Sequence, residues 1–463
     1  MTKKRIYLNA FEMVCAGGHQ SPGLWLHEDD RSHTYKDSEY WIELAKLLEK
    51  GKFDAVFLAD VLGTYDVYGG TRDAALRNAV QTPVNDPLLV VPLMSSVTEH
   101  LSFGVTASVS HEHPYTFARR MSTLDHLTKG RIGWNVVTSY LKSAAVNIGL
   151  DDQMSHDERY EFAAEYLDVC YKLWEGSWED GAVVRDKQSK VYTDPSKVHD
   201  IRHEGNYFKV PGAHLSEPSP QRTPVLFQAG ASPRGREFAS KHAESVFTAG
   251  PTIPVVKKGV DALRERIRAN GRNPEDVLVY TTFTAIVGKT EEEAQEKYET
   301  LKSHVSYEGA LALLSGWTGI DFSGYDPEDT LEYIQSNAMQ SAVEVFTRAD
   351  PDRKWTIGEL ATFVGIGGRG PVAVGTPEQV ADEVERWRDE TGVDGFNLAY
   401  TLAPGSFEDF VELVVPVLQE RGLVQKEYAD GTYREKIYGT GQAQLKDNHP
   451  GRTFKHLHEP ARN

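Results

Sequence analysis

The sequence predicts a parallel α/β barrel, because eight apolar runs follow one another along its 463 residues, most of them separated by helix-like or loop-like stretches. The runs are rich in Val, Ile, Phe and Ala without strict alternation, which suits strands covered by helices. Eight such units without a second domain favour a closed (βα)8 TIM barrel, and an open doubly wound sheet is the alternative. The predicted strands are Arg5–Phe11, Phe53–Asp60, Leu101–Ser110, Arg131–Ser139, Pro224–Gly230, Glu244–Gly250, Val277–Val287 and Val393–Tyr400.

Several helices between these strands carry clear signals. Ser38–Gly51 has apolar residues at helical spacing and stops at a glycine. Two further helices begin with a capping-box pattern, which pairs Ser155 with Glu158 and Thr376 with Gln379. Both patterns place a helix directly after a predicted loop, as a barrel requires.

Three segments exceed what a minimal barrel needs. Residues 175–217 after the fourth strand hold short strand-like runs, and residues 289–375 after the seventh strand hold helical stretches. Such excursions are usually lids or substrate loops, with a plain structural insert as the alternative. The last predicted helix, Phe407–Arg421, ends a single domain of residues 1–425. The polar segment 426–463 is expected to be an irregular tail that lies on the surface or wraps a second subunit.

The composition excludes several classes of protein. A net charge of −18 disfavours nucleic acids and anionic membranes as partners, because both are polyanions. No apolar run is long enough to span a bilayer, and the first residues lack a signal-peptide core, so we expect a cytoplasmic protein. Only two cysteines are present, which excludes a disulfide framework and a multi-cysteine metal site.

Polar residues follow or end several predicted strands, where the reactive groups of a parallel barrel collect. Asp60 can belong to a site or cap the following loop, and Asn135 can bind a ligand or be a satisfied core amide. The sequence therefore places a site at this end of the barrel and leaves these roles open. The residues concerned are Asp60, Thr106, Asn135, Gly230 and Ser232.

The strongest functional signal is a phosphate-binding pattern at two helix starts. Gly230 lets the backbone come close, and Ser232 offers a hydroxyl where a helix presents unpaired N–H groups. Ser-Pro at this point is also an ordinary helix cap. His156 and Tyr160 begin the helix after the fourth strand on one face, either as phosphate donors or as plain surface side chains. Two adjacent helix starts of this kind predict a phosphorylated cofactor.

Common catalytic motifs are missing from the sequence, which has no Walker loop, zinc-protease helix or serine elbow. The glycine-rich Val364–Pro371 follows a helix-like stretch instead of a strand. His111 and His113 resemble a metal pair without a third ligand, so no metal is expected. A phosphate anchor without a metal or covalent nucleophile predicts that the cofactor performs the reaction.

A family resemblance rests on six segments of the chain, and it extends from about Arg5 to Gln425. The chain resembles the flavin-dependent subunit of two-component monooxygenases in the bacterial-luciferase-like superfamily. Within it, the chain is similar to the branch of nitrilotriacetate, dibenzothiophene-sulfone and dimethyl sulfide monooxygenases. The segments are Gly51–Asp60, Arg119–Arg131, Trp134–Val137, His156–Tyr160, Gln228–Gly235 and Val393–Phe396.

The resemblance implies a luciferase-type barrel that binds reduced FMN supplied by a separate NAD(P)H-dependent flavin reductase. Reduced flavin would react with O2 to give a C4a-(hydro)peroxyflavin that oxygenates the substrate in a pocket shielded from water. Barrels of this kind commonly pair, so a homodimer or tetramer is expected. Carried over by motif, Asp60, Thr106 and Asn135 would lie by the isoalloxazine ring and ribityl chain, and His156, Tyr160, Gly230 and Ser232 would hold the phosphate.

The resemblance also suggests a small apolar organosulfur substrate such as dimethyl sulfide. His19 is the expected proton-handling group, with Phe11 and Trp317 beside the reaction. Trp317 stands where the dibenzothiophene-sulfone enzymes place a histidine, which weakens that alternative. An aromatic pocket over the flavin is expected from Phe11, His19, Trp25, Tyr65, Tyr68, Phe247 and Trp317, with core packing as the alternative for each aromatic.

The sequence leaves other functions open at this point. A halogenated aromatic compound could be dehalogenated or hydroxylated by the same chemistry. A deazaflavin-dependent oxidoreductase and a non-catalytic flavin-binding subunit are the alternatives outside this class.

Overall fold

Eight parallel strands form a closed barrel in the computed structural model, which describes residues 4–230, 232–331, 339–347 and 354–456. The order around the barrel is β1-β2-β3-β4-β9-β10-β11-β13, and the pairing of β13 with β1 closes it. All eight predicted strands are present, so the closed barrel is confirmed over the open sheet. They are β1 (Tyr7–Met13), β2 (Ala55–Ala59), β3 (Ser102–Ser108), β4 (Ile132–Val137), β9 (Val225–Gln228), β10 (Ser245–Thr248), β11 (Leu278–Val287) and β13 (Gly395–Ala399); β12 (Val372–Gly375) pairs with the end of β11.

Aromatic rings fill the barrel interior, and glycines on neighbouring strands make room for them. The ring centroids of Phe57 and Phe227 lie 5.5 Å apart. A Cβ added to Gly104 would stand 2.9 Å from the Phe57 ring, and one added to Gly133 would stand 2.7 Å from the Phe227 ring. Strands β3 and β4 therefore carry glycine where a larger residue would displace a ring, and the barrel is a packed core.

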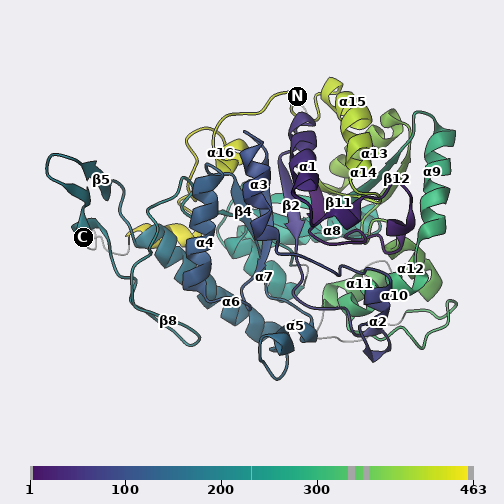
Figure 1. Ribbon diagram of the computed structural model, residues 1–463, viewed down its shortest axis with the longest axis horizontal. Coiled ribbons are helices and arrows are strands. Elements are labelled where there is room, and N and C mark those ends of the chain that lie inside the picture. The colour runs from purple at the N-terminus through teal and green to yellow at the C-terminus, as the bar shows by residue number, and fades with distance from the viewer. Residues whose placement is uncertain (1–3, 231, 332–338, 348–353, 457–463) are drawn as a thin grey trace.

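Helices cover the outside of the barrel and its carboxyl end (Figure 1). Within the described residues, none of them is long and apolar enough to cross a membrane. They are α1 (Ser38–Lys50), α2 (Asp73–Arg77), α3 (Val91–Ser96), α4 (Pro114–Leu127), α5 (Lys142–Asn147), α6 (His156–Tyr171), α7 (Pro233–His242), α8 (Ile253–Ala269), α9 (Glu291–His304), α10 (Tyr307–Thr318), α11 (Gln340–Thr347), α12 (Ile357–Val364), α13 (Pro377–Thr391), α14 (Gly405–Asp409), α15 (Val415–Glu420) and α16 (Tyr433–Tyr438).

The helix starts agree with the sequence signals except at one position. α13 begins with the predicted capping box, in which Thr376 and Gln379 each bond the other's backbone N–H. The box predicted at Ser155 and Glu158 is wrong, because the Ser155 side chain makes no cap hydrogen bond to α6. Helix α6 therefore begins without a side-chain cap. The predicted last helix is present as α14 and α15, joined by the π-helical segment Phe410–Val414.

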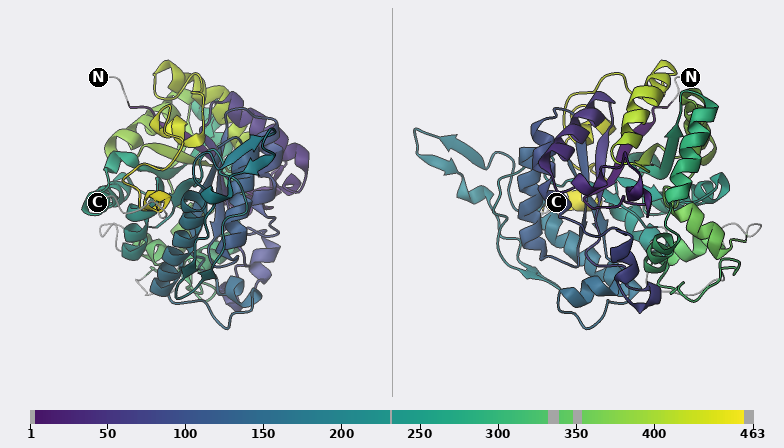
Figure 2. Two further views of the ribbon diagram at one scale, coloured as in Figure 1. Left: turned by 90° about the vertical axis from the view of Figure 1, so that its left-hand side faces the viewer. Right: turned by 45° about the vertical axis from the view of Figure 1, so that its right-hand side comes forward.

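The two predicted insertions have different structures. The first contains the hairpin of β5 (Val183–Asp186) and β6 (Val191–Thr193), which projects from the body (Figures 1 and 2), and a second short pair, β7 (His203–Glu204) with β8 (Lys209–Val210). The second insertion carries α9 to α12, and its residues 332–338 and 348–353 lie outside the described residues. The division into one domain and a tail stays a prediction.

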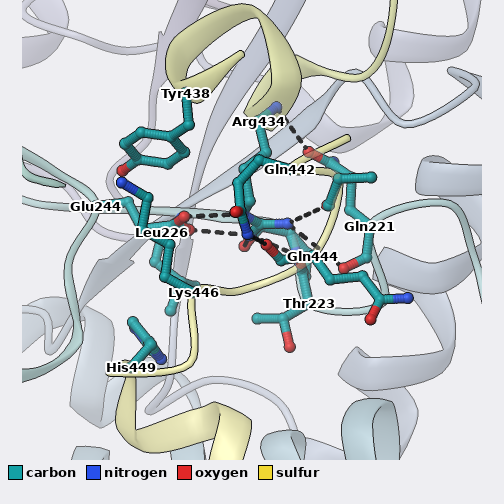
Figure 3. Close-up of polar contacts among 12 residues, drawn as sticks. Gln221, Thr223, Leu226, Glu244, Arg434, Tyr438, Gln442, Gln444, Lys446 and His449 are labelled. Carbon is teal, nitrogen blue, oxygen red and sulfur yellow. Dashed lines mark hydrogen bonds and ion pairs between the residues drawn. The ribbon is translucent and has the colours of Figure 1, made fainter. Parts of the chain in front are cut away.

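The expectation of an irregular surface tail is wrong for the middle of that segment. Helix α16 packs at the amino-terminal end of the barrel, opposite α2, α5 and α10 (Figure 1). The rings of Tyr433 and Phe227 lie 5.9 Å apart, and Arg434 is fully buried. The Arg434 Nε and Nη2 atoms donate to the two carboxylate oxygens of Glu244 at 2.8 and 2.9 Å (Figure 3). The polar sequence does not indicate this contact, because the Arg434 charge is paired with a carboxylate inside the protein. Residues 457–463 of the predicted tail lie outside the described residues.

Candidate active site

A cavity of about 270 Å3 at the carboxyl end of the barrel brings most of the predicted site residues together. They come from β1, from the ends of β2, β3 and β4, and from the starts of α6 and α7. These elements are far apart in the sequence, and only closure of the barrel makes them neighbours. The predicted residues in the lining are Phe11, Asp60, Thr106, Asn135, His156, Tyr160, Gly230, Ser232 and Phe247.

One end of the cavity has the geometry of an anion site. Ser232 caps α7, and its Oγ accepts a hydrogen bond from the Gly235 N–H at 3.0 Å. The same Oγ lies 3.3 Å from His156 Nε2, while His156 Nδ1 lies 2.8 Å from an Asp157 carboxylate oxygen. The Tyr160 and His156 rings pack edge to face with their centroids 5.3 Å apart, which confirms that the two residues share a helix face. Two helix starts and three polar side chains therefore converge at one point.

Gly235 shows that this point is a cradle. A Cβ on Gly235 would stand 2.8 Å from the Tyr160 hydroxyl, 2.9 Å from Gly230 Cα and 3.0 Å from Ser232 Oγ. Real side chains do not tolerate such distances, so only glycine lets the first turn of α7 come this close to Tyr160 and Gly230. The cradle is the set of polar groups that this close approach brings together, namely the Tyr160 and Ser232 hydroxyls, the His156 imidazole and the N–H groups of the two helix starts. Such groups suit a compact anion such as a phosphate monoester, which accepts hydrogen bonds from N–H and O–H groups.

The rest of the cavity offers unpartnered polar atoms. Asn135 Nδ2 donates to Thr106 Oγ1 at 3.0 Å, which leaves the buried Asn135 Oδ1 without a partner. Gln228 Oε1 and Thr282 Oγ1 are also buried and unpartnered. Buried polar atoms are normally satisfied, so these atoms fit a ligand with several polar ring atoms. An FMN molecule has both required parts, a phosphate and a polar ring system.

Asp60 is the cavity carboxyl that titrates near neutral pH. Burial and the nearby Asp86 carboxylate raise the pKa of Asp60 to about 7, against a hydrogen bond from the Val61 N–H. The group can therefore hold or release a proton under ordinary conditions.

The predicted catalytic residues His19 and Trp317 are not in the cavity lining. His19 is buried with its ring edge-on to Phe11 at 4.2 Å, and burial followed by the Arg369 charge lowers its pKa to about 3. The ring is therefore neutral near pH 7, which disfavours proton donation by His19. Trp317 is buried behind the Arg369 guanidinium, which stands 5.0 Å over its ring. Their proposed roles stay predictions.

The other expected pocket aromatics lie elsewhere. Tyr65 is buried behind Tyr140, and their hydroxyl oxygens are 2.7 Å apart. Tyr68 is half-buried outside the lining, and Trp25 is 43% exposed. The aromatic lining of the pocket instead comes from Phe11, Phe57, Phe247, Tyr140 and Tyr160.

Several residues in or beside the cavity were not predicted from the sequence. Gly235 lies beside the lining, one turn after Ser232, and the anion pattern could have indicated it. Gln20, Gln228 and Arg369 carry no local signal, because they reach the cavity only through the folded loops.

A buried carboxyl beside this region gives a pH-dependent prediction. Burial raises the pKa of Glu12 to about 7, against hydrogen bonds from Tyr400, the Met13 N–H and Tyr40. The folded protein therefore keeps a proton that the unfolded chain releases above about pH 4.5. This contribution to stability is full at low pH and is lost as pH rises to about 7.

Urea unfolding between pH 5 and pH 8 tests this assignment. Relative to Glu12→Gln, the native protein should lose about 3 kcal/mol of its free energy of unfolding over this range. The variant is neutral at this position and supplies the control slope. Parallel profiles for the two proteins would contradict a raised pKa at Glu12.

The fold and the site define a class of protein, a (βα)8 barrel whose carboxyl end offers a cradle for a phosphorylated cofactor. The chain belongs to the luciferase-like monooxygenase family, whose family model matches residues 23–395.

Individual relatives match over nearly the whole chain. Dimethyl-sulfide monooxygenase of Hyphomicrobium sulfonivorans is 51% identical, over 98% of this chain and 94% of the relative. Long-chain alkane monooxygenase of Geobacillus thermodenitrificans is 53% identical over 99% of both chains. A crystal structure of long-chain alkane monooxygenase superposes with a TM-score of 0.90 and covers 98% of this chain and 100% of its own. A riboflavin lyase structure with modified FMN is 38% identical, with a TM-score of 0.91, over 98% of this chain and 100% of that one.

These matches confirm the family, the fold and the enzyme class expected from the sequence. The chain is a flavin-dependent monooxygenase, and the expectation of FMN with O2 agrees with the family. The named relatives act on different compounds, so similarity alone leaves the substrate undecided.

Proposed function

We propose that this chain is the oxygenating component of a two-component system. It takes FMNH2 from a separate NAD(P)H-dependent flavin reductase and uses O2 to oxygenate a small organosulfur compound such as dimethyl sulfide. The observation that carries the proposal is the cradle of His156, Tyr160 and Ser232 at the starts of α6 and α7, which lines one end of a small cavity with aromatic and unpartnered polar side chains. The expected homo-oligomer stays part of the proposal.

The residues of the chain divide the work between the two ends of the cavity. Bound reduced FMN would supply the electrons that activate O2. His156, Tyr160 and Ser232 hold the phosphate with the starts of α6 and α7. Phe11, Phe57 and Phe247 exclude water from the end of the cavity where oxygen would react with the substrate. Exclusion of water protects the activated oxygen from decay. Asp60 holds or gives up a proton near neutral pH.

The cavity volume favours one of the two substrate classes that the relatives suggest. A space of about 270 Å3 is small for a flavin ring together with a long hydrocarbon chain. A thioether with few carbon atoms needs far less room. Long-chain alkane hydroxylation is therefore the second candidate, favoured by the 53% identity. Oxidation of halogenated aromatics and of dibenzothiophene sulfone are further alternatives.

Product mass spectrometry under 18O2 tests the proposal. The protein, FMN, NADH and a flavin reductase are mixed with dimethyl sulfide, alkanes of several lengths, dibenzothiophene sulfone or chlorinated phenols. We expect one labelled oxygen atom in the product of dimethyl sulfide and no NADH oxidation when the reductase is left out. Label only in an alkanol would assign the second candidate. Peroxide alone from every compound would contradict an oxygenase of this substrate range.

A further inference from the structure

The glycine-rich segment Val364–Pro371 presents an arginine to the cavity. Arg369 lines the cavity, and its Nε atom is buried without a hydrogen-bond partner. Among the described residues, no ion pair to this guanidinium is found. Burial lowers the pKa of Arg369, but an arginine stays charged.

The glycines fix the place of this side chain. Gly367 and Gly368 have φ angles of 79° and 81°, a region that other residues rarely adopt. A Cβ on Gly368 would collide with the Gln20 side chain, and one on Gly370 would collide with Thr282. The loop is therefore pressed against the end of β11 and the segment after β1, and Arg369 has little freedom to turn away.

The groups around Arg369 do not neutralise its charge. Its guanidinium stands over the Trp317 ring at 5.0 Å and lies near the Tyr140 and Tyr65 phenols. Gln81 Nε2 donates to the His19 carbonyl oxygen, so Gln81 Oε1 accepts a hydrogen bond from the Tyr65 O–H at 2.9 Å. The Tyr65 oxygen then accepts a hydrogen bond from the Tyr140 O–H, and both phenols remain neutral. A half-buried cation without an ion pair is costly, and an anion arriving in the cavity would lower that cost.

The position of the loop indicates which anion this is. The phosphate cradle follows β4 and β9, whereas the Arg369 loop packs on β11 and on the segment after β1. These strands lie on the opposite side of the barrel. The phosphate has its own donors, so Arg369 meets the other end of a cofactor that spans the cavity. Two electrons and one proton convert the oxidised flavin ring to a ring that carries one negative charge.

We propose that Arg369 compensates the negative charge of the reduced flavin ring in FMNH−, the anionic form of FMNH2, and thereby makes the cavity prefer reduced over oxidised FMN. This inference rests on the proposed function only in that FMN binds in the cavity. The role of the glycine-rich segment would then be to position Arg369 at the cofactor, a role that the barrel fold does not need for its own stability.

Anaerobic titrations test this role without turnover. The dissociation constants of FMN and FMNH2 are measured for the native protein, Arg369→Met and Arg369→Lys, together with the two-electron potential of the bound flavin. Arg369→Met should bind FMNH2 at least about tenfold more weakly, with little change for oxidised FMN. The potential then falls by about 30 mV for each tenfold change. Arg369→Lys keeps the charge and should retain most of the preference.

The exposed Arg386→Met is the matched control, because among the described residues Arg386 forms ion pairs with Glu383 and Glu390 alone, on the surface of α13. An FMNH2-to-FMN affinity ratio that stays within about twofold in Arg369→Met would overturn the proposal. If KM for the organosulfur substrate rises at the same time, the guanidinium serves the substrate. Failure of the native protein to bind either form of FMN would instead contradict the proposed function. Should Arg369→Met fold poorly, Arg369→Gln supplies the neutral variant.

Discussion

Replacing Arg434 by methionine is expected to lower the free energy of unfolding by about 3 to 5 kcal/mol, because the change leaves a buried carboxylate without its partner. Arg434 is fully buried and bonds both oxygens of Glu244 and the carbonyl oxygens of Thr223, Pro224 and Ala443. Burial alone would raise the pKa of Glu244, yet Arg434 holds this pKa below its usual value. Urea unfolding at pH 7 measures the loss.

The control for this prediction is again Arg386→Met. Arg386 is half-exposed and pairs with two carboxylates on one helix, so its removal should cost less than about 1 kcal/mol. Equal and small effects at the two positions would show that α16 is not fastened to the barrel through Arg434. A large effect at Arg434 alone supports the tail as part of the folded core.

Gly235→Ala is expected to weaken binding of FMNH2 by about 100-fold, the loss of one or two hydrogen bonds to a charged group. The new methyl group would occupy the space between Tyr160, Gly230 and Ser232. Alanine is the better helix former, so helix propensity alone predicts no fall in stability from the substitution. Anaerobic fluorescence titration of the reduced cofactor, together with thermal unfolding, separates the two effects.

Gly212→Ala is the matched control for the cradle. No heavy atom lies within 4 Å of a Cβ at Gly212, so the change should leave both affinity and unfolding temperature unaltered. If Gly235→Ala binds FMNH2 as tightly as Gly212→Ala does, the phosphate lies elsewhere and the assignment of α6 and α7 is wrong.

The barrel could be predicted from the sequence because its strands are continuous apolar runs. β2, for example, is Ala55–Ala59, in which four of five residues are buried. The meeting of Ser232 and His156 could also be predicted, since both stand at starts of helices that follow neighbouring strands. Each of these inferences uses only short-range information.

Features that depend on contacts between residues far apart in the sequence could not be predicted. Arg434 is a charged residue in a polar segment, and its sequence neighbours do not indicate that it pairs with the buried Glu244. His19 and Trp317 were placed in the pocket by resemblance, but Arg369 stands in front of Trp317. The predicted cap at Ser155 was wrong because the sequence pattern does not fix which way a short side chain turns.

The most direct test of the whole account compares reduced FMN with reduced riboflavin, which has the same ring and no phosphate. Anaerobic titration of the native protein should give an affinity for FMNH2 at least about 100-fold higher than for reduced riboflavin. Gly235→Ala should remove most of this difference. Equal affinity of the native protein for the two compounds would contradict a phosphate cradle at α6 and α7, and with it the position assigned to the cofactor.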